Sequence, residues 1–284
     1  MGRLEVEMMR FHEYIKPSRT EALARRQLVE QVRSHVREAL PEAALEVFGS
    51  ERTGLAFATS DIDLRLLKVA ELEQSVSSVL PPPKSQRVRL LDDIYRLFRH
   101  LRKNSQYEHC AVLHARYPLV SLRDKASGLD VQIVLSNDTS LSRAIIRKYI
   151  EEYPFIRPVY SVVKTMFDIR GLSDTFRGGF GSYSIFMMIV ASFRHCNWDT
   201  PPASAGEGLK AFIDFWTVFD TTKKGISLEP TEFYDKATDA PMTDTIRAKL
   251  QVRSFVSLSL HLYCTNSWLE QGGPVSARLL SVPA

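Results

Sequence analysis

Two aspartates separated by a single residue are the feature of the sequence that most clearly points to chemistry. Asp61 and Asp63 flank Ile62 in a short apolar segment. Residues i and i+2 of a strand project to the same face, so the two carboxylates point together while Ile62 points into a core. Like charges held this close favour a bound cation, and oxygen-only ligands suit Mg²⁺ or Mn²⁺ better than zinc.

Three further residues indicate a site that handles phosphate. Gly49 and Ser50 follow a predicted strand, where a missing side chain and a hydroxyl let backbone N–H groups and Oγ approach a phosphate. Asp130 lies within another predicted strand, and a carboxylate in a buried strand needs a partner. Three strand-borne acids beside such a turn match two-metal phosphoryl transfer, because two ions about 3.5–4 Å apart must be clamped.

A second group of motifs lies further along the chain. It comprises residues 153–164 (Tyr-Pro-Phe-Ile-Arg-Pro-Val-Tyr-Ser-Val-Val-Lys), Arg170-Gly171-Leu172 and residues 178–184 (Gly-Gly-Phe-Gly-Ser-Tyr-Ser). Together with the acids, these motifs resemble the nucleotidyltransferase superfamily of DNA polymerase beta-like enzymes. The closer resemblance is to the non-canonical poly(A) polymerases and terminal uridylyltransferases of the DNA polymerase sigma group, and it extends from the start of the chain to about Phe193.

The resemblance implies a role for each motif in nucleotidyl transfer. Asp61, Asp63 and Asp130 would hold two Mg²⁺ or Mn²⁺ ions and carry the catalytic chemistry. An NTP, by default ATP with UTP as the alternative, would react with the 3′ end of an RNA. The residues implied in nucleotide binding are Gly49, Ser50, Lys164, Ser182 and Tyr183. Without the resemblance, Lys164 is more typical of a surface lysine and Tyr183 of a core aromatic.

The sequence departs from the family pattern in three places. Asp168 stands where relatives often have a second basic residue, which puts the strength of triphosphate binding in question. Ser142-Arg143 replaces an Asn-Thr pair that lies near the nucleotide sugar. The acidic nucleotide-recognition loop has no convincing counterpart between Ile226 and Asn266, so the sequence does not give the base preference.

The apolar periodicity predicts the elements that must position these residues. A helix over 19–39 precedes short strands at Leu45–Phe48 and Ile62–Leu67, and a basic amphipathic helix covers Arg87–Lys103. Further strands are expected at 110–115, 119–122 and 129–135, and helices at 141–152, 155–170, 182–195, 209–219 and about 245–269.

This pattern predicts an α+β fold. The resemblance implies that residues 41–137 form a polymerase beta-like palm domain, with a mixed sheet and helices, joined to a mainly helical poly(A) polymerase-type central domain. Residues 1–40 and 138–271 form that helical domain if the opening helix packs on it, and 272–284 form a flexible tail.

Composition excludes some classes of protein. The 44% hydrophobic and 25% charged residues are ordinary for a globular chain, and no apolar run is long enough to span a membrane. Three scattered cysteines and the lack of a leader-like segment indicate an intracellular location, nuclear, cytoplasmic or mitochondrial. The net charge is only +4, but basic side chains cluster on the second predicted helix and are expected to follow an RNA backbone: Arg87, Arg96, Arg99, Arg102 and Lys103.

Two other functions compete with RNA tailing. A catalytically weak or inactive paralogue would serve as an RNA-binding or scaffold subunit, which the divergent C-terminal third favours and the three acids oppose. An enzyme that modifies a small molecule would keep the chemistry but lose the second group of motifs. No RNA-binding module accompanies the core, so a separate RNA-binding partner protein is expected to supply specificity.

Overall fold

The computed structural model describes residues 2–68, 84–114, 118–135, 140–174, 179–196, 200–221, 223–228 and 231–235. These residues form two compact units, which are considered separately. The sheet unit runs from His12 to Lys148, and the helical unit joins residues 2–11 to the described residues from Tyr149 onward.

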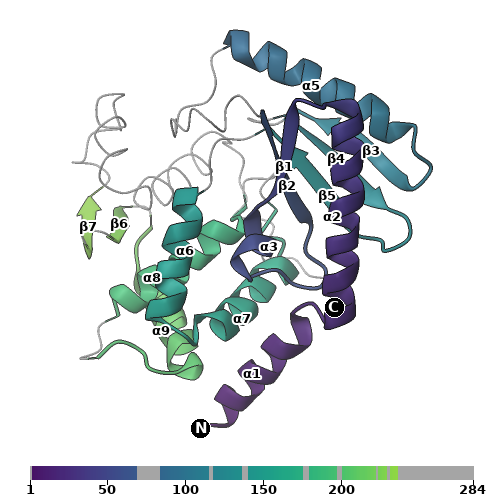
Figure 1. Ribbon diagram of the computed structural model, residues 1–284. Helices are drawn as coiled ribbons and strands as arrows, with labels where there is room; N and C mark the ends of the chain where they lie inside the picture. The colour runs from purple at the N-terminus through teal and green to yellow at the C-terminus, as the bar shows by residue number, and fades with distance from the viewer. Residues whose placement is uncertain are drawn as a thin grey trace, which may run out of the picture. The chain divides into compact units, whose positions relative to one another are not determined.

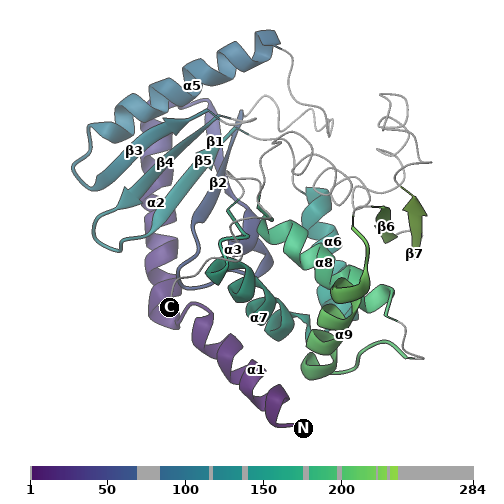
Figure 2. The same ribbon diagram turned by 180° about the vertical axis from the view of Figure 1, so that it is seen from behind.

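The sheet unit contains one mixed sheet and the helices that pack on it (Figures 1 and 2). Its elements in chain order are α2 (Arg19–Ala39), β1 (Ala43–Val47), α3 (Gly49–Thr53), β2 (Ile62–Lys68), α5 (Lys84–Arg102), β3 (Tyr107–Leu113), β4 (Leu119–Asp124) and β5 (Asp130–Val134). Two helices cross the unit boundary, α1 (Arg3–Ile15) and α6 (Ser140–Glu152).

The five strands lie in the order β1-β2-β5-β4-β3. Only β2 and β5 run parallel, and the other neighbours are antiparallel. The parallel pair places Ile62 opposite Val131 and Asp63 opposite Gln132. The two strands that carry the predicted acids are therefore direct neighbours in the centre of the sheet.

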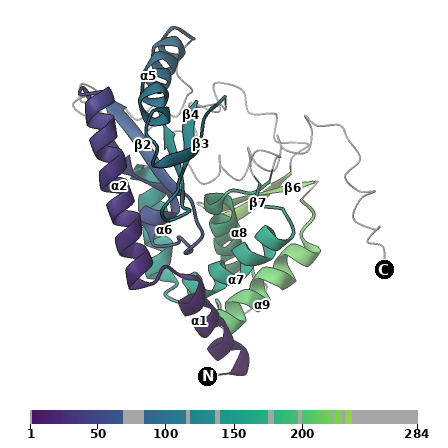
Figure 3. The same ribbon diagram turned by 90° about the vertical axis from the view of Figure 1, so that its right-hand side faces the viewer.

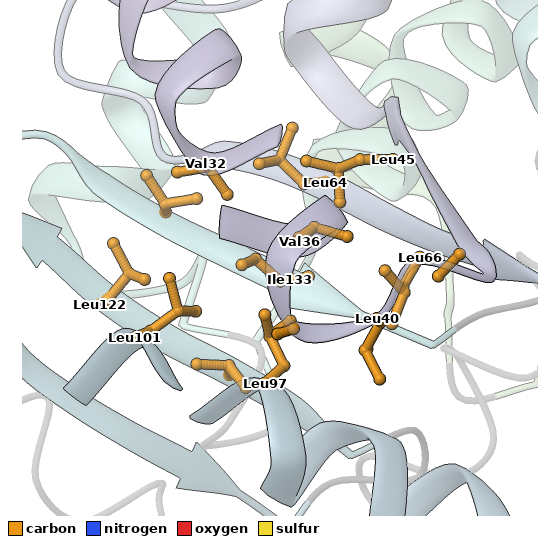
Figure 4. Packing of buried hydrophobic residues seen from close by; sticks show 14 of the residues in the cluster. Val32, Val36, Leu40, Leu45, Leu64, Leu66, Leu97, Leu101, Leu122 and Ile133 are labelled. Carbon is orange, nitrogen blue, oxygen red and sulfur yellow. The ribbon is translucent and has the colours of Figure 1, made fainter. Parts of the chain in front are cut away.

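One face of this sheet forms the core of the unit (Figure 4). Ile62, Leu64 and Ile133 are fully buried on it, and Val32 and Val36 of α2 lie against them. The apolar face of α5 completes the layer with Ile94, Leu97 and Leu101. Because side chains alternate along a strand, the residues between the buried ones project from the opposite face.

The first long helix begins where the sequence predicts. The Ser18 side chain accepts from the Glu21 amide, and the Glu21 carboxylate accepts from the Ser18 amide, which completes a capping box. Its apolar stripe packs on the sheet, so α2 belongs to the sheet unit. Of residues 1–40, which the sequence assigned to the helical domain, residues 2–11 lie in the helical unit and α2 lies in the sheet unit. Spacing shows that a helix has an apolar face but not which partner covers it.

Apart from its portions of α1 and α6, the described part of the helical unit consists of packed helices and a small hairpin (Figure 3). Its elements are α7 (Ile156–Ile169), α8 (Ser182–Arg194), α9 (Ala205–Val218), β6 (Lys224–Leu228) and β7 (Thr231–Asp235). Helix α8 is buried nearly all round from Ser184 to Phe193, as expected for the central helix of a bundle.

The helices and strands predicted within the described residues are confirmed to within a few residues, and α1 and the β6–β7 hairpin are additions. The predicted helix over 245–269 and the tail over 272–284 lie outside the described residues. Among those described, no helix has the length and apolarity that a membrane crossing requires.

Candidate active site

Asp61 and Asp63 lie at the start of β2, on the face of the sheet opposite the core. Ile62 and Leu64, which alternate with them, have no exposed surface. The alternation expected from the sequence is therefore present, and it directs both carboxylates to one side.

Gly49 brings the chain close to Asp63. The Phe48 amide donates to the Asp63 carbonyl at 3.0 Å, and Gly49 follows with a φ of +65°. A Cβ atom at Gly49 would lie 2.3 Å from Oδ2 of Asp63. Glycine is required here both by the left-handed backbone and by the carboxylate that occupies the space of a side chain.

The surroundings of Asp63 disfavour the charged form of its carboxyl group. Burial, together with the neighbouring charge of Asp61, raises its pKa from 3.8 to about 7, and Glu51 acts in the same direction while Arg25 opposes it. Two carboxylates on one face beside a glycine form a donor set of hard oxygens, which fits a divalent cation such as Mg²⁺ or Mn²⁺. Such an ion would relieve the repulsion between the two acids.

Arg25 of α2 fixes the loop that leads into Asp61. The side chain is 1% exposed, and its Nε donates to Oε2 of Glu51 at 2.8 Å. Its two Nη atoms donate to the carbonyls of Ala58, Ser60 and Asp61 at 3.3, 2.8 and 3.2 Å. Sequence analysis missed this residue, because a charged residue inside an amphipathic helix normally lies on the solvent face.

Asp130, predicted as the third acid, begins β5 on the same face of the sheet. Its carboxylate accepts two hydrogen bonds from Arg123 of β4, at 2.8 Å from Nε and 2.7 Å from Nη2. Gln132, the next residue of β5 on this face, contacts the acid pair: its Nε2 donates to Oδ2 of Asp61 at 2.7 Å. The only sequence signal for Gln132 was its polarity at an alternating position of an apolar strand.

Lys164 lies on α7 in the helical unit. Its ammonium forms an ion pair with Asp168 one turn further along the same helix, and Ser173 also donates to this carboxylate. The residue that departs from the family pattern is therefore the residue that neutralises the predicted triphosphate-binding lysine.

Ser182 and Tyr183 form the first turn of α8. Ser182 is hydrogen-bonded to the Tyr160 hydroxyl, and Tyr160 lies one turn before Lys164 on α7. Gly181 caps the helix without a side-chain hydrogen bond, so the first N–H groups of α8 lack a side-chain cap. The Tyr183 hydroxyl is buried and has no hydrogen-bond partner among the described residues, and burial raises its pKa.

Four basic residues in the described part of α5 and just after it are exposed, but they lie on the core side of the sheet. Arg96, Arg99 and Arg102 are on the outer surface of a helix whose inner surface packs against the sheet, and Lys103 directly follows this helix, so the sheet separates them from the acids. Arg96 pairs with Glu42 at 3.6 Å, and Arg102 stacks on Phe98. The side chain of Arg87 lies outside the described residues.

Arg143, one of the two residues expected near the nucleotide sugar, contacts a carboxylate of β1. Arg143 of α6 donates to Oε1 of Glu46 at 2.9 Å, and Arg65 donates to the other oxygen at 2.6 Å. Arg143 therefore helps to neutralise a strand carboxylate.

Curated proteins similar to this chain are poly(A) RNA polymerases. Poly(A) RNA polymerase protein 2 of Saccharomyces cerevisiae is 31% identical over 194 residues, which cover 68% of this chain and 30% of the relative. Poly(A) RNA polymerase cid14 of Schizosaccharomyces pombe is 27% identical over 187 residues, which cover 65% of this chain and 25% of the relative. The chain thus spans a third or less of the length of these two relatives.

Solved structures share the fold. The polymerase core of TRAMP, described as an RNA surveillance complex, matches with a TM-score of 0.68 and 24% identity over 82% of this chain and 70% of that one. A structure of the GLD-2/RNP-8 complex matches with a TM-score of 0.69 and 17% identity over 83% and 81%. The α+β polymerase beta-like fold is thereby confirmed.

The model of one protein family covers the sheet unit and its flanks. This family, described as "Poly(A) RNA polymerase, mitochondrial-like, central palm domain", matches residues 4–151, which include Gly49 and the Asp61–Asp63 pair. The resemblance seen in the sequence motifs is confirmed, and the chain belongs to the mitochondrial-like poly(A) RNA polymerase family.

Proposed function

We propose that the chain is a template-independent RNA 3′-nucleotidyltransferase, which adds AMP from ATP to RNA 3′ ends. The observation that carries this proposal is the Asp61–Asp63 pair, held on one face with the Asp63 carboxylate against Gly49. Family membership and the curated relatives, which are poly(A) RNA polymerases, support the same activity.

Residues of each unit are proposed to have separate roles in this reaction. Asp61 and Asp63 would hold Mg²⁺ or Mn²⁺, which would activate the RNA 3′-hydroxyl and stabilise the charge on the leaving pyrophosphate. Gly49 and Ser50 would bind phosphate oxygens through the backbone and a hydroxyl. Lys164 would supply a positive charge for the triphosphate, together with Ser182 and the uncapped N–H groups of α8.

The nucleotide is the finer part of the proposal. Solved structures with this fold include mtPAP in complex with ATPγS and the Cid1 poly(U) polymerase with MgGTP bound. Tyr183 is proposed to stack on the base. ATP is proposed because the curated relatives are named as poly(A) polymerases, and UTP is the alternative that the assay must include.

A primer-extension assay tests the activity. Purified protein is incubated with labelled oligo(A) RNA, Mg²⁺ or Mn²⁺ and each NTP separately, beside the double variant Asp61→Ala with Asp63→Ala. Asp214→Asn, an exposed acid on α9, is the matched control. Extension with ATP that the double variant abolishes and the control retains is expected. Extension with UTP alone would overturn the choice of nucleotide.

A second candidate function is a scaffold or RNA-binding subunit with little catalytic activity. The observation that favours it is the third predicted acid: Asp130 is engaged by Arg123, and an amide contacts Asp61 instead. No extension with any NTP, together with retained binding of the RNA, would establish this function in place of the first.

Two further parts of the proposal concern RNA binding: α5 contacts the RNA, and a partner protein supplies additional RNA-binding surface. The matching structures of TRAMP and of GLD-2/RNP-8 are complexes, and we propose that this chain also acts with an RNA-binding partner. Arg96→Glu with Arg99→Glu is expected to weaken RNA binding and reduce its salt dependence. Unchanged affinity and salt slope would remove α5 from the RNA-binding surface.

A further inference from the structure

We infer that Gln132, and not Asp130, is the β5 residue of the metal site, so that the site contains two carboxylates and a neutral amide. This inference rests on the proposed function for the identity of the bound ions. The inference follows from the strand register and from two sets of hydrogen bonds on this face: one joins Gln132 to Asp61, and the other joins Arg123 to Asp130.

The register places Gln132 beside the acid pair. In the parallel ladder of β2 and β5, Asp63 and Gln132 are direct partners. Both alternate with fully buried residues, Ile62 on one strand and Val131 on the other, so both project from the same face. The Gln132 amide reaches Asp61 as well, at 2.7 Å from Nε2 to Oδ2.

Asp130 has a different partner on the other side of its strand. Arg123 is its direct partner in the antiparallel ladder of β4 and β5, and it binds both carboxylate oxygens. This geometry is the bidentate one in which a guanidinium matches a carboxylate. A divalent ion on Asp130 would have to displace Arg123 or lie beside its positive charge, and either arrangement opposes binding.

A site with the Gln132 amide in place of a third carboxylate binds divalent ions differently. A glutamine Oε1 is still a hard oxygen ligand, so the arrangement admits one divalent ion between Asp61 and Asp63. Two ions a few ångströms apart repel each other, and clamping them requires negative charge from the protein. With one carboxylate fewer, we expect the second ion to bind weakly unless the triphosphate supplies the missing charge.

Direct measurement of Mn²⁺ binding tests the assignment without reference to activity. Free Mn²⁺ is followed by electron paramagnetic resonance during titration of the 284-residue chain and of the variants Gln132→Asp, Asp130→Asn and Asp61→Asn. Affinity depends on the number of charged ligands. Gln132→Asp should therefore tighten Mn²⁺ binding by about tenfold or more, and Asp61→Asn should weaken it by about tenfold or more. Asp130→Asn should change it by less than about twofold, because its charge is already matched by Arg123.

Two results would overturn the inference. If Asp130→Asn weakens binding as much as Asp61→Asn does, Asp130 is a ligand. If Gln132→Asp folds, as judged by circular dichroism, and binds Mn²⁺ no more tightly, Gln132 is not at the site; Gln132→Glu provides a second test with the original side-chain length. Failure of the proposed function gives a different result, in which the Mn²⁺ affinities follow the expected pattern but neither the wild type nor Gln132→Asp extends RNA with any NTP.

Discussion

Replacement of Arg25 by methionine is expected to destabilise the sheet unit at the point where Asp61 is positioned. Methionine keeps most of the length and apolar volume of arginine but removes every hydrogen-bond donor. The change leaves Glu51 without its partner and removes the donor from the carbonyls of Ala58, Ser60 and Asp61.

The magnitude follows from the burial of the pair. Removing one member of a buried ion pair costs about 3–5 kcal/mol, because the other charge is left without compensation. Glu51 is 24% exposed, so water can solvate part of its charge and the lower end of that range applies. The three carbonyls lie in a loop and can also find water once it opens. We therefore expect a loss of about 3 kcal/mol in the local free energy of opening.

Amide hydrogen exchange of the peptides that span β1 and β2 measures this quantity. A chain of two units does not unfold in a single two-state step, so exchange of the β1–β2 peptides is more informative than a single midpoint. A loss of about 3 kcal/mol corresponds to roughly 100-fold faster exchange of the protected amides. Arg26→Met, at the adjacent exposed position, is the matched control. Exchange in Arg25→Met that is no faster than in the control would refute the argument that Arg25 holds this loop.

Three other perturbations test separate parts of the site. Gly49→Ala should cost about 1–3 kcal/mol more than Gly128→Ala in thermal unfolding, since both glycines have positive φ but only Gly49 has a carboxylate in the way; equal costs would contradict this. With metal chelated, the folded protein binds the Asp63 proton more tightly than the unfolded chain does, so stability should fall as pH rises from 3.8 to about 7. In thermal unfolding measured at a series of pH values, Asp63→Asn should reduce this dependence of stability on pH. If the variant keeps the same pH dependence, other groups cause it. Asp168→Asn should lower the KM for ATP by about fivefold by releasing Lys164, whereas an unchanged KM would exclude competition between carboxylate and nucleotide.

The local features of the fold could be predicted because they depend on short-range chemistry. The capping box at Ser18 and Glu21, the alternation around Ile62 and the breaks between strands are set by hydrogen bonds and side-chain directions within a few residues. The pairing of Lys164 with Asp168 was not predicted, although residues four apart lie on one face of a helix.

The sequence by itself therefore determined the helices and strands of the described residues, apart from α1 and the β6–β7 hairpin, and that Asp61 and Asp63 project together. Only the tertiary structure decided that α2 packs on the sheet, that Arg25 turns inward to the loop before Asp61, and that β5 pairs with β2 in the register that presents Gln132. The physical reason is that these outcomes depend on contacts between segments distant in sequence. Periodicity shows that a face is apolar or polar, but the partner of that face is fixed by the packing of the whole unit.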